Sequence, residues 1–289
     1  KTKGTKADSV EKVTVADLLP TLEKTDFKLD EQPYSSLFKI YQKEFLEISV
    51  STGLIHADAL ALAGDGTPVV TSHRERKKRI CKCKENGIHD CNCDRYFSQP
   101  DCDIGWDSSR DCYYHGYDLY MLVDSQSDLP VFPHFSCASK HDSHGFLHAF
   151  FRMKSFLPEY SVSKVLLDSA HDAMPYYQYF KRENITPFID LNGKGGRPPV
   201  YKNDFTIDKD GVPICPSGYR MRRDGIEVAK GRMKFKCPKI SHADGCISCR
   251  CKKPCSNAKY GRTVHLVLKD NPRLFNNLPR SSKEWKLEY

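Results

Sequence analysis

The feature that most constrains the fold of this chain is an alternation of β-prone and helix-prone segments through its central part. Several segments are rich in β-branched and aromatic residues, as strands are. The segment that follows them has apolar side chains at three- and four-residue intervals, the spacing of an amphipathic helix. Several strands followed by a strand–helix–strand unit predict an α/β domain with a mixed sheet and flanking helices. Strands are expected at 54–71, 112–124, 129–139, 161–170 and 185–192, and helices at 144–157 and 173–184.

Composition divides the chain into four parts. The first shows helical spacing, the second holds the α/β core, and the third is loop-rich, basic and rich in cysteine. A polar, basic, Cys-rich insertion over about 73–112 interrupts the core. We therefore expect a helical segment at 1–50, the core at 51–192, a Cys-rich basic insertion subdomain at 193–280 and the start of another helical region at 281–289.

Length and charge narrow the class of protein. The 289 residues, 39% of them hydrophobic, can bury one large core or two ordinary ones. No run of eighteen apolar residues occurs, and the opening KTKGTKADSVEK lacks the apolar part of a secretory signal, so we expect a cytoplasmic protein without a membrane partner. The net charge is +8. Positive charge gathers in 72–84 and 219–236, which suits a polyanionic partner but is also the pattern of a solvated surface.

The chain has 13 cysteines, an odd number for a disulfide framework. In a reducing compartment, closely spaced thiols are metal ligands or unliganded thiols rather than disulfides. The later cysteines combine ICPSG, FKCP and a run with Cys-x2-Cys spacing, and four of them could hold a structural Zn²⁺. The candidate zinc ligands are Cys215, Cys237, Cys246, Cys249 and Cys255, with Cys251 lying within the same run.

An earlier cluster, CKCKENGIHDCNC, contains two Cys-x-Cys pairs and His89. It could bind a second ion, although Cys-x-Cys is a looser signature than Cys-x2-Cys. Unliganded thiols are the alternative for both clusters. Elemental analysis of the purified protein distinguishes the two.

Two acids follow apolar strand-like segments. Asp65 comes after LALAG, and Asp168 comes after KVLL. Ligands of open α/β sheets bind at the carboxyl ends of strands, and two carboxylates brought together there repel unless a hard cation lies between them. Such a pair can hold Mg²⁺ for an in-line phosphoryl displacement. The ordinary alternatives are an Asp-Gly hairpin turn at Asp65 and a helix N-cap at Asp168.

The chain resembles bacterial insertion-sequence transposases of the DDE type, which have an RNase H-like catalytic domain. The resemblance runs from about Tyr41 to Tyr289 and rests on several blocks in a fixed order. These blocks are ALAGDGTPVVTSHRERKK, YFSQPDCDIGWDSSRDCYYHGYDLYML, LLDSAHDA, PFIDLN, GVPICPSGYRM, CSNAKYGRT and SSKEWKLEY.

The resemblance implies that Asp65 is the first catalytic acid, on the first strand of the fold, and Asp168 the second, on the fourth strand. Both would bind Mg²⁺, or Mn²⁺ in its place. The third acid of the family, a Glu on a helix, is expected beyond Tyr289, and neither Glu284 nor Glu288 is assigned to that role.

A transposase of this type would hydrolyse a phosphodiester at the transposon end and transfer the freed 3′-hydroxyl to target DNA in line. It would act on double-stranded DNA as a homodimer in the synaptic complex, in the bacterial cytoplasm with the nucleoid. The basic residues expected to contact DNA phosphates are Arg74, Arg76, Lys77, Lys78, Arg79, Lys194 and Arg197.

Two other functions compete with this reading. The chain could be a zinc-stapled, non-catalytic remnant of a transposase that binds DNA without cutting it. GDGT also resembles the loop of haloacid-dehalogenase-like phosphatases, but the nucleophilic Asp of that family falls on Ala63 here. Two smaller features have ordinary interpretations. The aromatic residues Trp106, Tyr113 and Tyr114 could stack on bases but are expected in the core, and His141 is expected to form surface hydrogen bonds.

Overall fold

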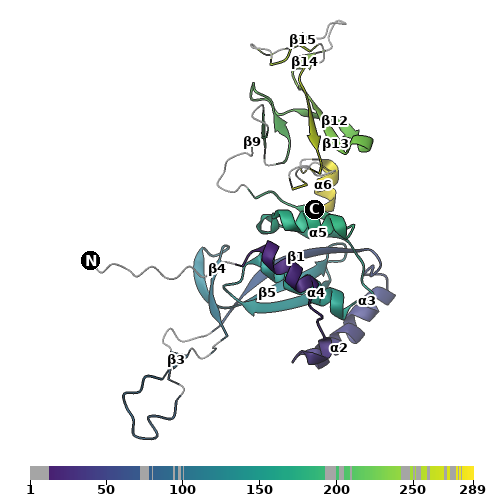
Figure 1. Cartoon of the computed structure of the whole chain (residues 1–289). Helices are drawn as coiled ribbons and strands as arrows, with labels where there is room; N and C mark the ends of the chain where they lie inside the picture. Colours follow the sequence, from purple (N-terminus) through teal and green to yellow (C-terminus); the bar gives the residue numbers. More distant parts are fainter. Residues whose placement is uncertain are drawn as a thin grey trace, which may run out of the picture. The chain divides into compact units, whose positions relative to one another are not determined.

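The structure is a computed structural model that falls into two compact units, Lys1–Val162 and Ser163–Tyr289 (Figure 1). Each unit is described by itself. The residues that the structure describes are 13–71, 78–79, 81–93, 95–96, 99, 101–192, 200–201, 205–208, 210–241, 248–249, 251, 255–258, 261–269, 272–273, 278, 280 and 282–289.

The first unit begins with helices, in agreement with the expectation for 1–50 within its described part. A capping box starts the first of them, because the backbone N–H of Thr14 donates to the Asp17 carboxylate, 2.9 Å away. Phe38 is buried against the rings of Phe132 and Phe156. The helices are α1 (Val15–Glu23), η1 (Leu29–Glu31), α2 (Ser35–Tyr41), the π-helix η2 (Gln42–Leu46), α3 (Glu47–Ser51) and, later in the chain, α4 (Asp142–Phe156).

An antiparallel group of strands forms the sheet of this unit. A long central strand pairs with the first strand on one side, and on the other with two strands that follow each other along its length. The prolines of the expected strand at 129–139 are accommodated because, among the described strands, that strand pairs only with the central one. The strands are β1 (Leu60–Val70), β4 (Asp103–Asp107), β5 (Cys112–Asp124) and β6 (Pro130–Cys137), and a separate two-stranded ladder joins β2 (Lys78–Arg79) to β3 (Arg95–Tyr96).

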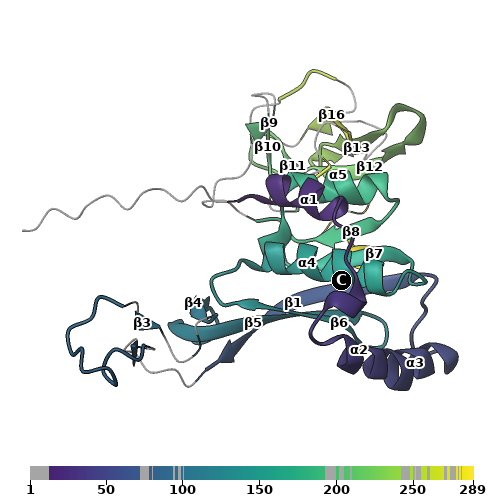
Figure 2. The ribbon, with the colours of Figure 1, turned by 60° about the horizontal axis from the view of Figure 1, so that its bottom comes forward.

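The two faces of this sheet differ because successive side chains of a strand point to opposite sides. Figure 2 shows α4 along one side of β1 and β5. On this side Tyr120 and Leu122 are fully buried. Gly145 of α4 allows the close approach, since a Cβ there would lie 2.9 Å from the Tyr120 ring. Tyr114 lies on the same side of β5 and is buried, as expected. Tyr113 is exposed, which contradicts the prediction that it lies in the core.

Trp106 also contradicts the expectation of a core position. It lies in β4 directly opposite Tyr113, and both side chains are exposed. Their rings meet edge to face with centroids 4.8 Å apart. The alternation of β5 puts Tyr113 on the face opposite to Tyr114, which explains why two neighbouring aromatic residues differ in burial.

The second unit opens with the expected strand, helix and strand. β7 (Val162–Leu167) and β8 (Thr186–Ile189) pair in parallel, joined by η3 (Ser169–His171) and α5 (Met174–Arg182). The last helix of the chain, α6 (Lys283–Glu288), contributes the buried Trp285, whose ring packs 4.9 Å from that of Phe188.

The region after 200 contains short antiparallel strands around a small core of its own, so it is more regular than the loop-rich character of its sequence indicates. Buried side chains of this core include Ile207, Met221, Phe235 and Leu266. The elements are β9 (Val200–Tyr201), β10 (Phe205–Ile207), β11 (Pro213–Ile214), β12 (Arg222–Glu227), η4 (Val228–Lys230), β13 (Arg232–Lys236), β14 (Ile240–Ser241), β15 (Ser248–Cys249) and β16 (Thr263–Val267).

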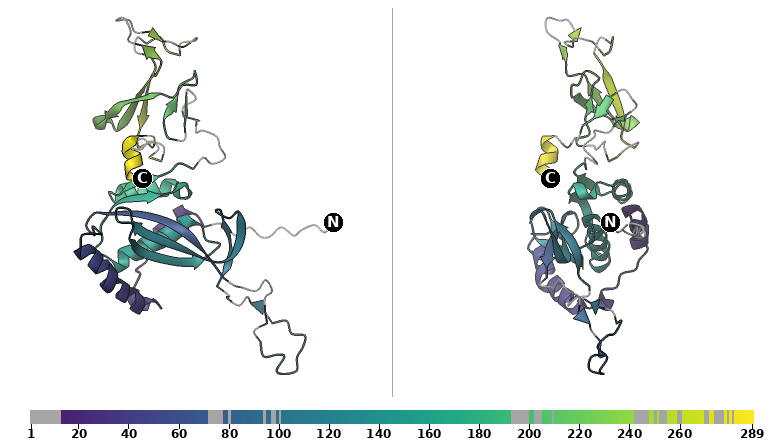
Figure 3. Two further views of the ribbon diagram at one scale, coloured as in Figure 1. Left: turned by 180° about the vertical axis from the view of Figure 1, so that it is seen from behind. Right: turned by 90° about the vertical axis from the view of Figure 1, so that its left-hand side faces the viewer.

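The chain is therefore of the mixed α/β class, with antiparallel pairing in the first unit, parallel pairing between β7 and β8, and helices beside the strands (Figure 3). This confirms the predicted class at that level. Within the described ranges, no helix combines the length and the apolar character needed to cross a bilayer.

Candidate metal centre and acidic positions

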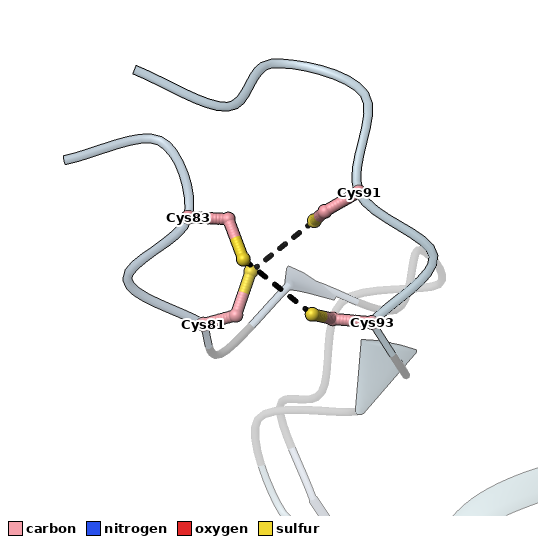
Figure 4. Close-up of side chains that lie close together, drawn as sticks. All are labelled: Cys81, Cys83, Cys91 and Cys93. Atoms are coloured by element: carbon pink, nitrogen blue, oxygen red, sulfur yellow. Dashed lines mark hydrogen bonds between the residues drawn. The ribbon is translucent and has the colours of Figure 1, made fainter. Parts of the chain in front are cut away.

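Four cysteines of the earlier cluster come together in the loop between β2 and β3. The sulfurs of Cys81, Cys83, Cys91 and Cys93 all lie within 4.8 Å of one another. Figure 4 shows the four side chains pointing toward a common centre, with the Sγ atoms of Cys81 and Cys91 3.4 Å apart and those of Cys83 and Cys93 3.6 Å apart. The group does not include His89. These four thiols could hold a metal ion.

A tight turn brings the two Cys-x-Cys pairs together. The backbone N–H groups of Asn86 and Ile88 donate to the carbonyl of Cys83, at 3.1 and 2.8 Å. Gly87 has a φ of 74°, a left-handed conformation that glycine adopts without steric cost. None of the side chains from 81 to 93 is fully buried. Apolar packing therefore gives this loop little stabilisation. A metal ion bound to the four cysteines is the main candidate for what stabilises the fold of the loop.

The thiols influence one another's protonation. The pKa of Cys91 is lowered to about 7, first because a backbone hydrogen bond from Cys93 favours its thiolate. The pKa of Cys93 is raised to about 12, first by its hydrogen bond with Cys83. The lowered pKa of Cys91 favours its thiolate, the form that binds a metal.

The later cysteines are only partly described. Cys215 and Cys237 are buried and Cys255 is half-buried. Burial raises the pKa of the Cys255 thiol, and the neighbouring Cys215 and Cys237 raise it further, so the three lie near each other. Among the described residues they do not form a group as tight as that of the earlier cluster. Cys251 is half-buried, the Cys249 side chain and Cys246 lie outside the described residues, and zinc at this cluster stays a prediction.

Asp65 lies in the middle of β1, so the alternative of a hairpin turn at Asp65-Gly66 is wrong. β1 runs straight through both residues, which pair with Met121 and Tyr120 of β5. Neither has the positive φ that a type I′ turn requires. The chain stays extended here because β5, a strand distant in sequence, pairs with this whole stretch of β1. The Asp65 side chain is exposed, and its carboxylate accepts the backbone N–H of Gly66 at 2.8 Å.

Asp168 follows β7 directly, at the carboxyl end of that strand. Its carboxylate accepts the backbone N–H of Ala170 at 3.1 Å and lies 2.6 Å from the Nδ1 of His171. It therefore caps η3, which is the ordinary alternative expected for this residue. The Asp168 side chain is nevertheless 53% exposed, so a ligand can still reach it. Asp65 belongs to the first unit and Asp168 to the second, and their pairing stays a prediction.

Of the predicted DNA-contact residues, Lys78 and Arg79 are among those that the structure describes. Lys78 and Arg79 form β2, and their side chains are not described. Exposed cations that are described in the same loop are Lys82 and Lys84. The remaining residues, Arg74, Arg76, Lys77, Lys194 and Arg197, lie outside the described residues.

Two other polar residues have structural roles. His141 is the N-cap of α4, where its Nδ1 accepts the backbone N–H of Ser143 at 3.2 Å, in line with the hydrogen-bonding role expected from the sequence. Glu288 forms an ion pair with Lys164 and so already has a partner within its unit. Neither residue needs a catalytic explanation.

Sequence reasoning placed zinc in the later cluster first, whereas the tightest described group is the earlier one. The signal in the sequence was the repeat of Cys-x-Cys on both sides of a short polar segment ending in Gly-Ile-His-Asp. Comparison with known proteins adds no relative: no family model, no curated protein and no solved structure matches the chain.

Proposed function

We propose that this chain is the catalytic part of a DDE-type DNA transposase with an RNase H-like fold. The observation that carries the proposal is the order of its elements: antiparallel strands β1, β5 and β6, the helix α4, and then β7, α5 and β8 with parallel pairing of the two strands. In this series Asp65 lies on the first strand and Asp168 directly after the fourth. These are the two strand positions that the family resemblance requires.

The two acids suit the binding of a hard cation. Both carboxylates are exposed, and each accepts a backbone N–H from its own segment, which orients it. Mg²⁺ or Mn²⁺ bound there would activate a water or a 3′-hydroxyl for in-line attack on a phosphodiester. His171, fully buried at 2.6 Å from the Asp168 carboxylate, would keep that carboxylate oriented.

The glycines beside Asp65 have a packing role. A Cβ at Gly64 would lie 2.8 Å from the Tyr120 hydroxyl, and one at Gly66 would lie 2.8 Å from the Asp142 carboxylate. Both contacts are on the side of the sheet that packs against α4. The glycines therefore allow β1 to approach its neighbours while Asp65 projects from the other face, toward any substrate.

We also propose that the ion held by the earlier cysteine group is a structural Zn²⁺. Four thiolates at a zinc–sulfur distance of about 2.3 Å place the sulfurs about 3.8 Å apart in a tetrahedron. Two of the sulfur separations are 3.4 and 3.6 Å and none exceeds 4.8 Å, so the four thiols need modest adjustment to reach that geometry. A four-thiolate zinc site is anionic, and the exposed Lys82 and Lys84 beside it would offset part of that charge.

A nicking assay tests the transposase proposal. The purified chain is incubated with supercoiled plasmid and Mg²⁺ or Mn²⁺, together with the variants Asp65→Ala and Asp168→Ala. Each variant should lower cleavage by roughly 100-fold or more while DNA binding in a gel-shift assay is unchanged. Asp58→Ala, at an exposed acid of the same unit, should cleave like the wild type.

The other outcomes separate the alternatives. DNA binding without metal-dependent cleavage by the wild type supports the non-catalytic DNA-binding remnant. Hydrolysis of a small phosphomonoester such as p-nitrophenyl phosphate, lost in Asp65→Ala, supports the phosphatase. Wild-type cleavage that both variants retain overturns the assignment of the two acids.

A further inference from the structure

A buried carboxylate on β5 has no counter-charge among the residues that the structure describes. Asp118 lies opposite Pro68 of β1, and its side chain is 6% exposed. No described residue donates a hydrogen bond to it or forms an ion pair with it. A largely buried ionised carboxylate without a partner is unfavourable, so a group that neutralises it would stabilise this position.

A second carboxylate points to the same place. Measured from the position that a Cβ on Gly66 would occupy, the Asp142 Oδ1 is 2.8 Å away and the two Asp118 oxygens are 3.1 and 3.2 Å away. Asp142 is in the first turn of α4, and Asp118 is in the middle of β5. Two elements far apart in sequence thus direct carboxylate oxygens at one point above a residue without a side chain.

The described charged groups that act on Asp118 are all negative. Burial, Asp142 on α4 and Asp65 on β1 together raise its pKa to about 6. The Tyr114 ring lies nearby on the same strand, and its own pKa is raised by burial and by Asp118 and Asp142. At neutral pH the site therefore favours an added positive charge.

We propose that Asp118 and Asp142 bind a divalent cation that prefers oxygen ligands, such as Mg²⁺ or Ca²⁺. Hard cations use one or two carboxylates with water as the remaining ligands, and here both carboxylates come from rigid elements. The ion would tie the start of α4 to the centre of the sheet. Its two ligands differ from the proposed Asp65–Asp168 pair, and the proposal does not depend on the transposase proposal.

A shared proton is the alternative to a cation. Two carboxyl groups close together can hold one proton between them, as like charges raise one pKa. A proton pair would need no metal and would respond to pH alone. The two explanations therefore differ in whether an added cation binds at neutral pH.

Terbium luminescence tests the proposal, because Tb³⁺ takes oxygen ligands and the Tyr114 ring can sensitise its emission. Tb³⁺ is titrated at pH 7.5 into the full chain and into Asp118→Asn, Asp142→Asn and the control Asp124→Asn. Asp124 is also buried on β5, but Ser127 donates two hydrogen bonds to it. We expect saturable emission that Ca²⁺ displaces, at least ten-fold weaker in the first two variants and retained in the control.

A double variant, Asp65→Asn with Asp168→Asn, keeps this test separate from the transposase proposal. It should retain the Tb³⁺ signal even if plasmid cleavage is lost. Emission that persists in both Asp118→Asn and Asp142→Asn, or that disappears only in the double variant, overturns the proposal. So does a wild-type protein that binds no Tb³⁺, since a shared proton then explains the pair. Circular dichroism of each variant confirms that it is folded.

Discussion

Two regions of the first unit differ in the interactions available to stabilise them. Where α4 packs on β5, apolar side chains such as Tyr120, Phe146 and Phe150 are fully buried. In the loop from 81 to 93 no side chain is fully buried, and four sulfurs converge instead. The first region is held by the removal of apolar surface from water, and we propose that a metal bound to the four thiols holds the second. The comparison predicts that these two parts of one compact unit have nearly independent stabilities.

The largest effect is expected from the packed region. Phe146→Ala should lower the free energy of unfolding by about 3 to 5 kcal/mol, because it removes a buried ring and leaves a cavity. Urea denaturation followed by circular dichroism measures this change. Phe135→Ala, at an exposed ring of β6, is the control and should change it by less than about 0.5 kcal/mol. Equal effects at the two positions would show that the sheet face carrying Phe135 is also buried.

The second effect is local to the cysteine loop. Cys83→Ser, or treatment with a chelator, should abolish the zinc binding proposed for this loop and make the loop about ten-fold more sensitive to protease. The urea midpoint of the rest of the unit should stay unchanged, because the loop buries little apolar surface. Elemental analysis and limited proteolysis are the measurements, with Cys112→Ser at an exposed cysteine of β5 as the control. A matching fall in global stability would contradict the independence of the two regions.

The smallest effect is expected on the pH dependence of stability and comes from two histidines, His134 on β6 and His148 in α4. Burial lowers the pKa of His134 to about 3 and that of His148 to about 4, and their rings stack with centroids 5.2 Å apart. Between pH 6.5 and 4 the unfolded chain binds more protons at these positions than the folded one, so their contribution to stability falls as the pH falls. We expect a loss of about 1 to 3 kcal/mol over this range.

The variant His134→Gln isolates this contribution. Its stability should fall less steeply between pH 6.5 and 4 than that of the wild type, when both are measured by urea denaturation. His56→Gln, at an exposed histidine, should follow the wild-type curve. Parallel curves for wild type and His134→Gln would mean that His134 accepts a proton in the folded state.

Local pattern was sufficient for the elements whose side chains alternate or repeat clearly. The strand expected at 112–124 coincides with β5, and the helix expected at 144–157 differs from α4 by one or two residues at each end. The alternative of a turn at Asp65-Gly66 is wrong because these residues pair with β5, which is distant in sequence. The Asp-Gly pattern depends only on neighbouring residues, so it does not indicate whether such a partner strand exists.

The candidate sites were less predictable than the fold. Spacing identified two groups of cysteines but could not tell which one closes, since closure depends on the turn between Cys83 and Ile88. Asp118 was not recognised, because a lone acid within an aromatic strand has no motif. Only the meeting of β5 with the start of α4 reveals its second carboxylate.

The absence of a side chain at position 66 has an evolutionary consequence. An alanine there would put a methyl group 2.8 Å from the Asp142 carboxylate and 3.1 Å from that of Asp118, closer than real Cβ atoms normally come. Drift at this codon is thus constrained by two acids encoded far downstream. In diverging relatives, glycine at 66 should be lost only together with at least one of those acids, so the three positions should covary as a unit.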